Sequence, residues 1–498
     1  MLLNSVRGIC MDKIINRLLR QAEKAKKTGN YIEEINAYQK LYDLYKHELG
    51  EKHPDTLNAL GNLGNAYSKI GDYHKALEIA NMVYITKKDI FGENDSDILN
   101  ALENLAISYS ALGGYKKALE LEEEVYDARK QILGQNHPDT LYTLSNIAGI
   151  YCNLGDYNKA LESTNSVYDA MKEIFGENHP NTIKALSSVA VSFNNLGFHN
   201  KALEVEKAVY TRRKEILGDN HPETLRSLAN LASTYSDLGD YGKALELKNI
   251  VYNARKEILG DNHPETLRSL ANLAISYFDL GEYSKACELQ KIVYNARKEI
   301  LGENHPEALR SLANLANLYS GLGDYSKALE LQNTVYKAFK EILGENHPDT
   351  LSALNNLAIL CSDLGDYSKA LELHNTVYSA RKEILGNIHP DTLSALANLA
   401  ASYSHIGNYN KALELTNIVY NGLKEIFGET HPKTIDALEN IANIYNNLGF
   451  HNKALELENT VYNARKDFFG ESYPDTINTL SDRVLNRNIS TLSNRKLY

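Results

Sequence analysis

Histidines spaced 42 residues apart are the first feature that could do chemistry, because imidazole is the commonest metal ligand in proteins. A His-Pro pair recurs in every period from His137 to His431, and an earlier pair is His53-Pro54. Neighbouring packed helices lie about 8–10 Å apart, so at most two of these imidazoles could meet at one ion. No carboxylate or thiol stands where it would complete a tetrahedral set. We therefore expect no metal site, and we assign these histidines to capping or packing of loops between helices.

The other histidines and the cysteines show no catalytic arrangement. The sequence has no Gly-rich phosphate loop, no G-x-S-x-G nucleophile elbow and no H-E-x-x-H zinc motif. No cysteine belongs to a CxxC pair, so we expect reduced thiols in a cytoplasmic protein. These observations predict a protein that is not an enzyme and needs no cofactor. The residues concerned are His74, His199, His405, His451, Cys10, Cys152, Cys287 and Cys361.

The overall charge and hydropathy exclude two classes of partner. The formal net charge is −11, whereas binding to nucleic acid phosphates needs clustered positive charge. No apolar run approaches the roughly 18 residues of a membrane span. The N-terminus lacks the pattern of a signal peptide, and Met11 is an alternative start. We expect a cytoplasmic protein that binds neither nucleic acid nor membrane.

An internal repeat accounts for the histidine spacing. The 42-residue period holds over eleven steps without insertion or deletion, and all 10 prolines fall in the His-Pro register. Residues 214–232 and 256–274 are identical, and two further registers hold 22 of the 30 glycines. Repetition at this period is typical of a solenoid, in which each unit buries its apolar face against its neighbours.

Each unit reads as two helices. In one unit, Pro264 suits the first position of a helix, and apolar residues follow at helical spacing until Gly281. A second, longer helix begins near Tyr283 and ends at Gly302. The pattern predicts an all-α, right-handed α–α superhelix of about eleven helix-turn-helix repeats. We expect a short N-terminal extension (1–11), one uninterrupted solenoid (12–485) and a polar C-terminal tail (486–498).

The segment LANLANLYSGLGDYSKALEL (312–331) resembles the tetratricopeptide repeat. The resemblance rests on the small and large residues that seal the two helices of that motif: Leu312, Leu315, Ala316, Tyr319, Gly323, Tyr325 and Ala328. The usual period is 34 residues. The 42-residue period, with LG-x-x-HP between units and RKEILG at the end of the second helix, is similar to the kinesin light chain type of array. It covers roughly residues 15–480, but no heptad segment precedes the repeats, so we expect no motor role.

The resemblance implies that the first helix of each unit lines a concave groove that binds a protein or peptide. By that analogy, the exposed groove positions of the unit starting at Leu267 are Arg268, Ala271, Ile275, Phe278 and Asp279.

Four consecutive units carry a basic residue at the first groove position. Lys184, Arg226, Arg268 and Arg310 would align as a ladder that suits spaced carboxylates or a phosphopeptide. The floor beside this ladder is small or apolar, at Ala229, Ala271, Ala313, Ile275 and Phe278. The alternative is that the arginines reflect duplication of near-identical units and plain solvation, or that Asp237 and Asp279 neutralise them.

A ladder of asparagines is the second candidate, and it includes Asn230, Asn272 and Asn314. Such amides could clamp the backbone of a bound peptide. The alternative is hydrogen bonding between units of the scaffold, because nearly every unit carries this residue.

These patterns predict a monomeric, non-enzymatic scaffold or adapter that holds a partner peptide, with an acidic segment as the favoured ligand. One alternative is a regulatory or sensor module of a larger signalling complex. Another is a structural repeat protein that assembles end to end.

Overall fold

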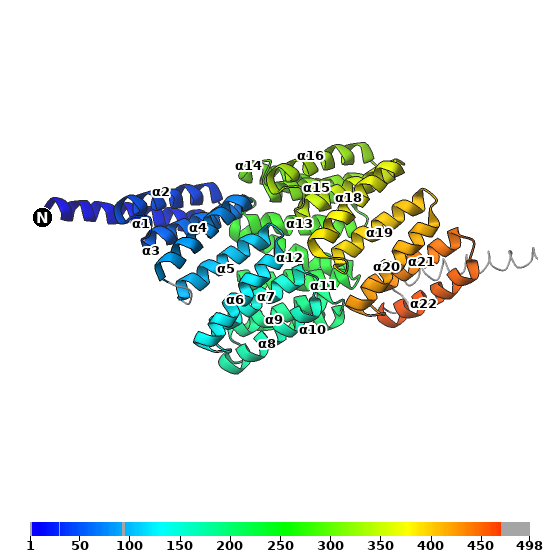
Figure 1. Ribbon diagram of the computed structural model, residues 1–498, viewed down its shortest axis with the longest axis horizontal. Helices are drawn as coiled ribbons and strands as arrows, with labels where there is room; N and C mark the ends of the chain where they lie inside the picture. The colour runs from blue at the N-terminus through cyan, green and yellow to red at the C-terminus, as the bar shows by residue number, and fades with distance from the viewer. Residues whose placement is uncertain (1, 29, 92–94, 470–498) are drawn as a thin grey trace, which may run out of the picture.

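The computed structural model describes residues 2–28, 30–91 and 95–469. These residues form 22 α-helices and no strand, arranged as eleven antiparallel pairs that follow one another along the chain (Figure 1). We number the pairs as units 1 to 11, so that unit 7 consists of α13 and α14. The expected all-α solenoid of about eleven helix pairs is confirmed.

The first helices of the units, which we call A helices, have 16 residues each except for the longer α1. Their bounds are α1 (Leu2–Thr28), α3 (Pro54–Lys69), α5 (Ser96–Ala111), α7 (Pro138–Asn153), α9 (Pro180–Asn195), α11 (Pro222–Asp237), α13 (Pro264–Asp279), α15 (Pro306–Gly321), α17 (Pro348–Asp363), α19 (Pro390–His405) and α21 (Pro432–Asn447).

The second helices, which we call B helices, have 19 residues each. Their bounds are α2 (Tyr31–Leu49), α4 (Tyr73–Phe91), α6 (Tyr115–Leu133), α8 (Tyr157–Phe175), α10 (His199–Leu217), α12 (Tyr241–Leu259), α14 (Tyr283–Leu301), α16 (Tyr325–Leu343), α18 (Tyr367–Leu385), α20 (Tyr409–Phe427) and α22 (His451–Phe469).

The expected N-terminal extension and the start of the expected solenoid lie on one helix. Helix α1 continues unbroken from Leu2 to Thr28, across the boundary that the sequence placed between residues 11 and 12. The last part of the expected solenoid and the expected polar tail lie outside the described residues.

The register histidines begin the A helices. Nδ1 of His263 accepts a hydrogen bond from the backbone N–H of Glu265 (3.2 Å), and Pro264 occupies the first helical position. The same cap recurs at the other His-Pro pairs of the described residues. Unit 3 has no histidine in this register, and Oδ1 of Asp95 accepts from the N–H of Asp97 (2.8 Å) instead. The capping role expected for the histidines is confirmed.

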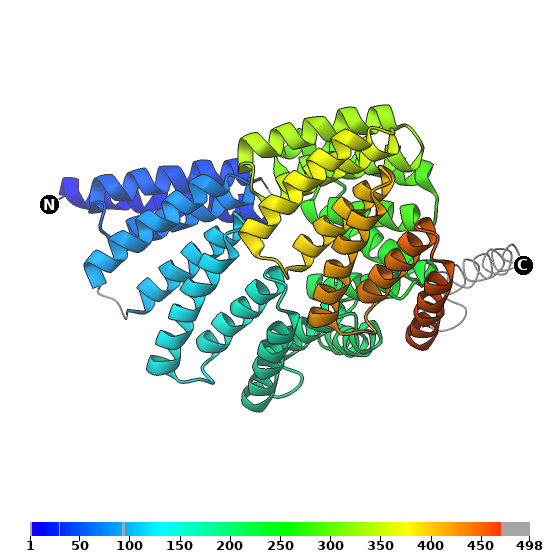
Figure 2. The same ribbon diagram turned by 45° about the vertical axis from the view of Figure 1, so that its right-hand side comes forward.

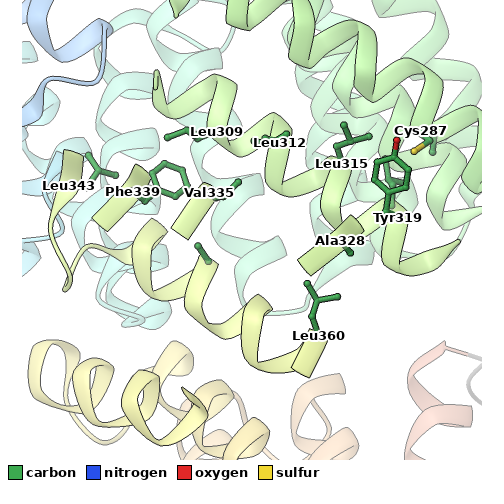
Figure 3. Close-up of a cluster of buried hydrophobic side chains, with 13 residues drawn as sticks. Cys287, Leu309, Leu312, Leu315, Tyr319, Ala328, Val335, Phe339, Leu343 and Leu360 are labelled. Atoms are coloured by element: carbon green, nitrogen blue, oxygen red, sulfur yellow. The ribbon is translucent and has the colours of Figure 1, made fainter. Parts of the chain in front are cut away.

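The core is continuous between units. Figure 3 shows α15 and α16 packing through Leu309, Leu312, Val335 and Phe339, with Cys287 and Leu360 contributed by the units on either side. Full burial of one such side chain contributes about 1.5–3 kcal/mol. Packing within each unit and stacking of neighbouring units therefore both contribute to stability, as expected for a solenoid.

The superhelix turns tightly enough for its second turn to contact its first. Nε2 of His305, at the start of unit 8, donates to the carbonyl of Lys69 in unit 2 (3.1 Å). His347 donates to Ala111 (3.1 Å), which joins unit 9 to unit 3 in the same way. Figure 2 shows the yellow helices of the second half meeting the blue and cyan helices of the first half. One superhelical turn therefore takes six units, which the sequence analysis did not predict.

Glycine is required where these turns meet. Gly71 has φ +79°, a left-handed conformation that side chains rarely adopt. A Cβ atom at this position would lie 2.3 Å from Cδ of Pro306 in unit 8. The contact between superhelical turns thus depends on a glycine as well as on a buried histidine.

Candidate binding site on the A helices

The ladder of basic residues exists, but carboxylates accompany it. Arg226 pairs with Glu223, and Nη2 of Arg268 lies 2.5 Å from Oε2 of Glu265. Nη1 of Arg310 lies 2.6 Å from Oε1 of Glu307. Lys184 instead stands over the ring of Tyr142, 5.7 Å from its centroid.

The aspartates proposed to neutralise the ladder lie elsewhere. Asp237 and Asp279 end the A helices of units 6 and 7, and both act electrostatically on Lys248. The carboxylates that accompany the arginines are instead those of the glutamates three residues before each of them. Arg310 has a second carboxylate partner in the next unit, with its Nη2 2.7 Å from Oδ2 of Asp349.

Each of these glutamates also serves a second, buried arginine. Oε2 of Glu265 lies 3.2 Å from Nη2 of Arg255, whose Nη1 donates to Oγ of Ser269 (2.9 Å). The junction of units 6 and 7 therefore places two guanidinium groups, those of Arg255 on α12 and Arg268 on α13, around one carboxylate. A pocket of about 300 Å³ between units 6 and 7 is lined by these groups together with Arg226. Three guanidinium groups and two carboxylates, those of Glu223 and Glu265, line this pocket, so the ladder keeps a local excess of positive charge there.

Three residues predicted for the groove meet in another pocket. Ile275, Phe278 and Asn314 line a cavity of about 260 Å³ between α13 and α15, and Gln290 of α14 contributes to its wall. Phe278 is held edge-on against Tyr283, with ring centroids 5.2 Å apart. Arg268 lies ten residues before Phe278, which is about 15 Å along a helix. The predicted site is therefore divided between the two ends of the A helices.

Two other expectations about the groove change. Ala271 is 8% exposed and packs in the core with Leu270, Leu273 and Val293, so it does not form an exposed floor. Asn230 is half-buried and hydrogen-bonds the side chain of Glu206 within the scaffold. Asn272 is also half-buried, whereas Asn314 is exposed.

The pocket beside Phe278 has two equivalents in other units. A pocket of about 600 Å³ lies between α5 and α7 over α6, and one of about 170 Å³ lies between α19 and α21 over α20. Residues at equivalent positions of the repeat line all three pockets, for example Asn146, Asn314 and Asn440. We call these three cavities the inter-unit pockets.

The B helix supplies a buried polar residue to each inter-unit pocket, and the sequence analysis missed this position. Glu122 and Gln290 are each 1% exposed, and Thr416 is 4% exposed. The signal was visible: this residue follows the repeated K-A-L-E-L run and changes from unit to unit while its neighbours repeat. We call this register the floor position: Tyr38, Ala80, Glu122, Thr164, Glu206, Lys248, Gln290, Gln332, His374, Thr416 and Glu458.

Burial favours the neutral form of Glu122, Glu206, Lys248 and His374 at the floor position. It raises the pKa of Glu122 to about 8 and that of Glu206 to about 7. Burial lowers the pKa of Lys248, and it lowers the pKa of His374 to about 4. Side chains of the next A helix contact these groups: Ser276 accepts from Lys248 (2.8 Å), and Ser402 lies 2.7 Å from Nδ1 of His374. The arrangement offers hydrogen bonds of different chemistry in each unit.

Within the described residues, no group of three or more His, Cys, Asp and Glu side chains could hold a metal ion. The thiols of Cys152, Cys287 and Cys361 are free, and burial raises the pKa of each. None of the helices in the part of the chain that the structure describes is long and apolar enough to cross a membrane.

A family model described as tetratricopeptide repeat matches most of the chain, at residues 16–84, 139–215, 184–257, 272–341, 323–383, 364–424 and 391–467. A second model with the same description matches residues 98–139. No curated protein matches the sequence.

Solved structures with a similar fold are distant in sequence. One is a protein of Podosopora anserina described as kinesin light chain nearly identical TPR-like repeats. Its sequence identity to this chain is 24% and the TM-score is 0.36, and the match covers 41% of this chain and 97% of that one. BtubC (BKLC) from P. vanneervenii is 17% identical, with a TM-score of 0.38 and coverage of 49% and 92%. A Rap protein complexed with competence and sporulation factor is 14% identical, with a TM-score of 0.49 and coverage of 74% and 98%.

Proposed function

The chain belongs to the tetratricopeptide repeat family, and from this premise we propose that it is a scaffold that holds an extended segment of a partner protein along its A helices. The family prediction made from residues 312–331 is confirmed. The binding of a peptide along this surface, and its chemistry, are the proposal.

The observation that carries the proposal is the row of inter-unit pockets. They recur at equivalent positions in units 3–4, 7–8 and 10–11, so a segment that follows the A helices meets a pocket of this kind every three or four units. The floor position changes between Glu, Gln and Thr in these pockets, which gives each a different hydrogen-bonding preference. A preformed surface of this kind loses little conformational entropy on binding.

The N-terminal ends of the A helices favour an acidic part of the same segment. In units 6 and 7 two arginines share one glutamate, so a partner carboxylate or phosphate can pair with the second guanidinium group. Changing Arg226, Arg268 and Arg310 to Ser should weaken capture of such a partner. The loss should be modest, because each of these arginines already has an intramolecular carboxylate.

The contact between superhelical turns supports a second candidate, a sensor whose curvature changes when it binds its partner. Three histidine bonds join units 8, 9 and 10 to units 2, 3 and 4 at the ends of helices, so they can open without disrupting the stacked units. A sensor of this kind should change its dimensions on partner binding, as measured by small-angle scattering, whereas a rigid scaffold should not.

The experiment that tests the scaffold compares two triple variants in capture from host lysate. The pocket variant combines Gly149→Ile, Asn317→Ile and Asn443→Ile, which fill the three inter-unit pockets. Isoleucine is tolerated at this repeat position, because units 3, 7 and 9 already carry it at Ile107, Ile275 and Ile359.

The matched control is Ser166→Ile, Thr334→Ile and Thr376→Ile, at exposed B-helix positions where Ile250, Ile292 and Ile418 occur naturally. We expect the control to capture the same partner as the wild type and the pocket variant to lose it. Equal capture by all three proteins would show that the partner does not use the inter-unit pockets.

A further inference from the structure

The inter-unit pocket between units 3 and 4 is larger than its two equivalents. Its volume is about 600 Å³, and its lining includes Ile107, Tyr115, Glu122, Asn146 and Gly149. Gly149 lies inside α7, and a Cβ atom built on it would meet nothing within 4 Å. Gly149 is the unit 4 equivalent of Ile275 in unit 7, so the space that an isoleucine side chain fills there is open in unit 4.

The carboxyl group of Glu122 at this pocket is incompletely paired. Glu122 is 1% exposed, and its Oε1 accepts from Nδ2 of Asn146 (3.3 Å). Its Oε2 has no hydrogen-bond partner among the described residues. A buried carboxyl oxygen without a partner carries a substantial desolvation penalty.

The charged groups around Glu122 leave the pocket without a cation of its own. Glu103 of α5 pairs with Arg129 of α6, with Nη1 of the arginine 3.1 Å from Oε1 of the glutamate. Arg129 also donates to Oγ1 of Thr143 on α7 (2.7 Å), so its guanidinium group is engaged with the scaffold. Among the described residues, no Lys, Arg or His side chain lines this pocket.

The fold does not need a carboxyl group at this position. Gln290 and Gln332 occupy the same register in units 7 and 8, and both are buried. Each donates from Nε2 to a carbonyl of the next A helix, at Ser311 (3.0 Å) and Ala353 (3.2 Å). Glutamine thus fits this environment through its Nε2 donor, although Oε1 of Gln332 has no partner. Glu122 differs in that its unpartnered Oε2 belongs to a residue that lines the largest of the three inter-unit pockets.

We propose that the pocket between units 3 and 4 receives an arginine or lysine side chain of the bound partner, with Glu122 as the carboxylate that pairs with it. This inference rests on the proposed function, because it assigns one pocket of the same surface. The guanidinium or ammonium group supplies N–H donors to Oε2, the atom that has no partner in the free protein.

The pairing requires one proton to leave. Burial beside Glu103 raises the pKa of Glu122 to about 8, and Asn146 and Arg129 only partly offset this effect. At neutral pH the free protein therefore holds Glu122 as the neutral acid, and entry of a cation ionises it and releases its proton to solvent. Because the binding form is the ionised one, affinity should rise by up to about tenfold per pH unit below pH 8 and level off above it.

The test is isothermal titration with capped pentapeptides in which Arg, Lys, Gln or Glu stands between pairs of alanines. We expect the Arg or Lys peptide to bind and the Gln and Glu peptides to bind at least about tenfold more weakly. Titrations at pH 6.5 in two buffers of different ionisation enthalpy should show release of close to one proton. Glu122→Gln should lose both the preference and the proton release, although it barely changes net charge at that pH.

Gly149→Ile is the second variant, because it fills the same pocket without touching Glu122, and Thr334→Ile is its control on a B helix. We expect Gly149→Ile to abolish binding of the Arg peptide and Thr334→Ile to leave it unchanged. Equal binding of the Arg and Gln peptides, retention of proton release in Glu122→Gln, or no binding at about 10 mM peptide would overturn the inference. In the capture experiment, the triple pocket variant could lose a partner that Glu122→Gln still captures. That result would support the proposed function and would overturn only the role given to Glu122.

Discussion

At the scale of the residue, the variable floor position explains how near-identical units can differ in chemistry. The run K-A-L-E-L repeats with few changes, while the next residue is Glu, Thr, Lys, Gln or His in different units. Sequence reasoning found the exposed Ile275 and Phe278 because helical spacing identifies an outward face. It did not find Glu122 or Gln290, because burial against the next A helix depends on the angle at which units stack.

Glu122 should lower the stability of the protein at neutral and alkaline pH. Its pKa is raised from 4.5 to about 8 in the folded state, so the unfolded chain loses this proton at lower pH than the folded protein does. The penalty therefore grows as pH rises from about 4.5 to 8. We expect Glu122→Gln to raise the free energy of unfolding by about 4 kcal/mol at pH 8 and far less at pH 5.

Urea denaturation of both proteins at the two pH values measures this difference. An equal effect at pH 5 and pH 8 would mean that the raised pKa does not contribute and that the variant acts through packing alone.

At the scale of the element, the period and the punctuating residues were enough to place the helices. The His-Pro pair predicted the start of each A helix, and the observed cap gives the reason: imidazole Nδ1 accepts from an otherwise unpaired N–H two residues later. Asp95 shows that the requirement is for an acceptor rather than for imidazole. The boundary expected between residues 11 and 12 stays a prediction, and it falls within α1, where no His-Pro pair or glycine marks a helix end.

His221 tests the cap alone, since this histidine is partly exposed. We expect His221→Ala to destabilise the protein by about 1 kcal/mol and His221→Asp to leave stability nearly unchanged, as Asp95 does the same job in unit 3. Urea midpoints compare the three proteins. A similar loss in both variants would show that imidazole packing, rather than capping, is what matters there.

At the scale of the whole molecule, the contact between superhelical turns gives the same residue two different environments. His53, His137, His179, His221 and His263 are half-exposed, whereas His305, His347, His389 and His431 are buried against units six positions earlier. All nine stand in the same motif, so no local pattern distinguishes them. The number of units per superhelical turn is set by a small rotation between neighbouring units. Neither the 42-residue period nor the apolar stripes of the helices predict the size of that rotation.

Acid should open this contact. Burial lowers the pKa of all four histidines, to about 4 for His431, and the backbone carbonyl that Nε2 faces at His305, His347 and His389 only partly offsets this effect. The open form binds more protons below the ordinary histidine pKa near 6.5, so the closed form loses stability as pH falls from about 6.5 to 4. Each histidine faces its own charged and titratable groups. His305 faces Glu307, Arg297 and Arg310, and His347 faces Asp349, Arg310 and His74. His389 faces Asp391 and Arg381, and His431 faces Lys433 and His199.

Small-angle scattering at pH 7.5 and pH 4.5 measures the opening as a larger radius of gyration. Replacing the four buried histidines by Asn, which retains a cap acceptor, should give the open dimensions at both pH values. Unchanged dimensions of the wild type across this range would contradict the role given to the contact.

The central claim is that a partner segment lies across the inter-unit pockets, and photo-crosslinking from single sites tests it most directly. A photoreactive residue at position 317 lines a pocket, and one at position 334 lies on the exposed face of a B helix. We predict that the captured partner crosslinks from position 317 through one short segment and does not crosslink from position 334. Crosslinking from position 334 alone, or equally from both, would contradict the account and move the binding site off the A helices.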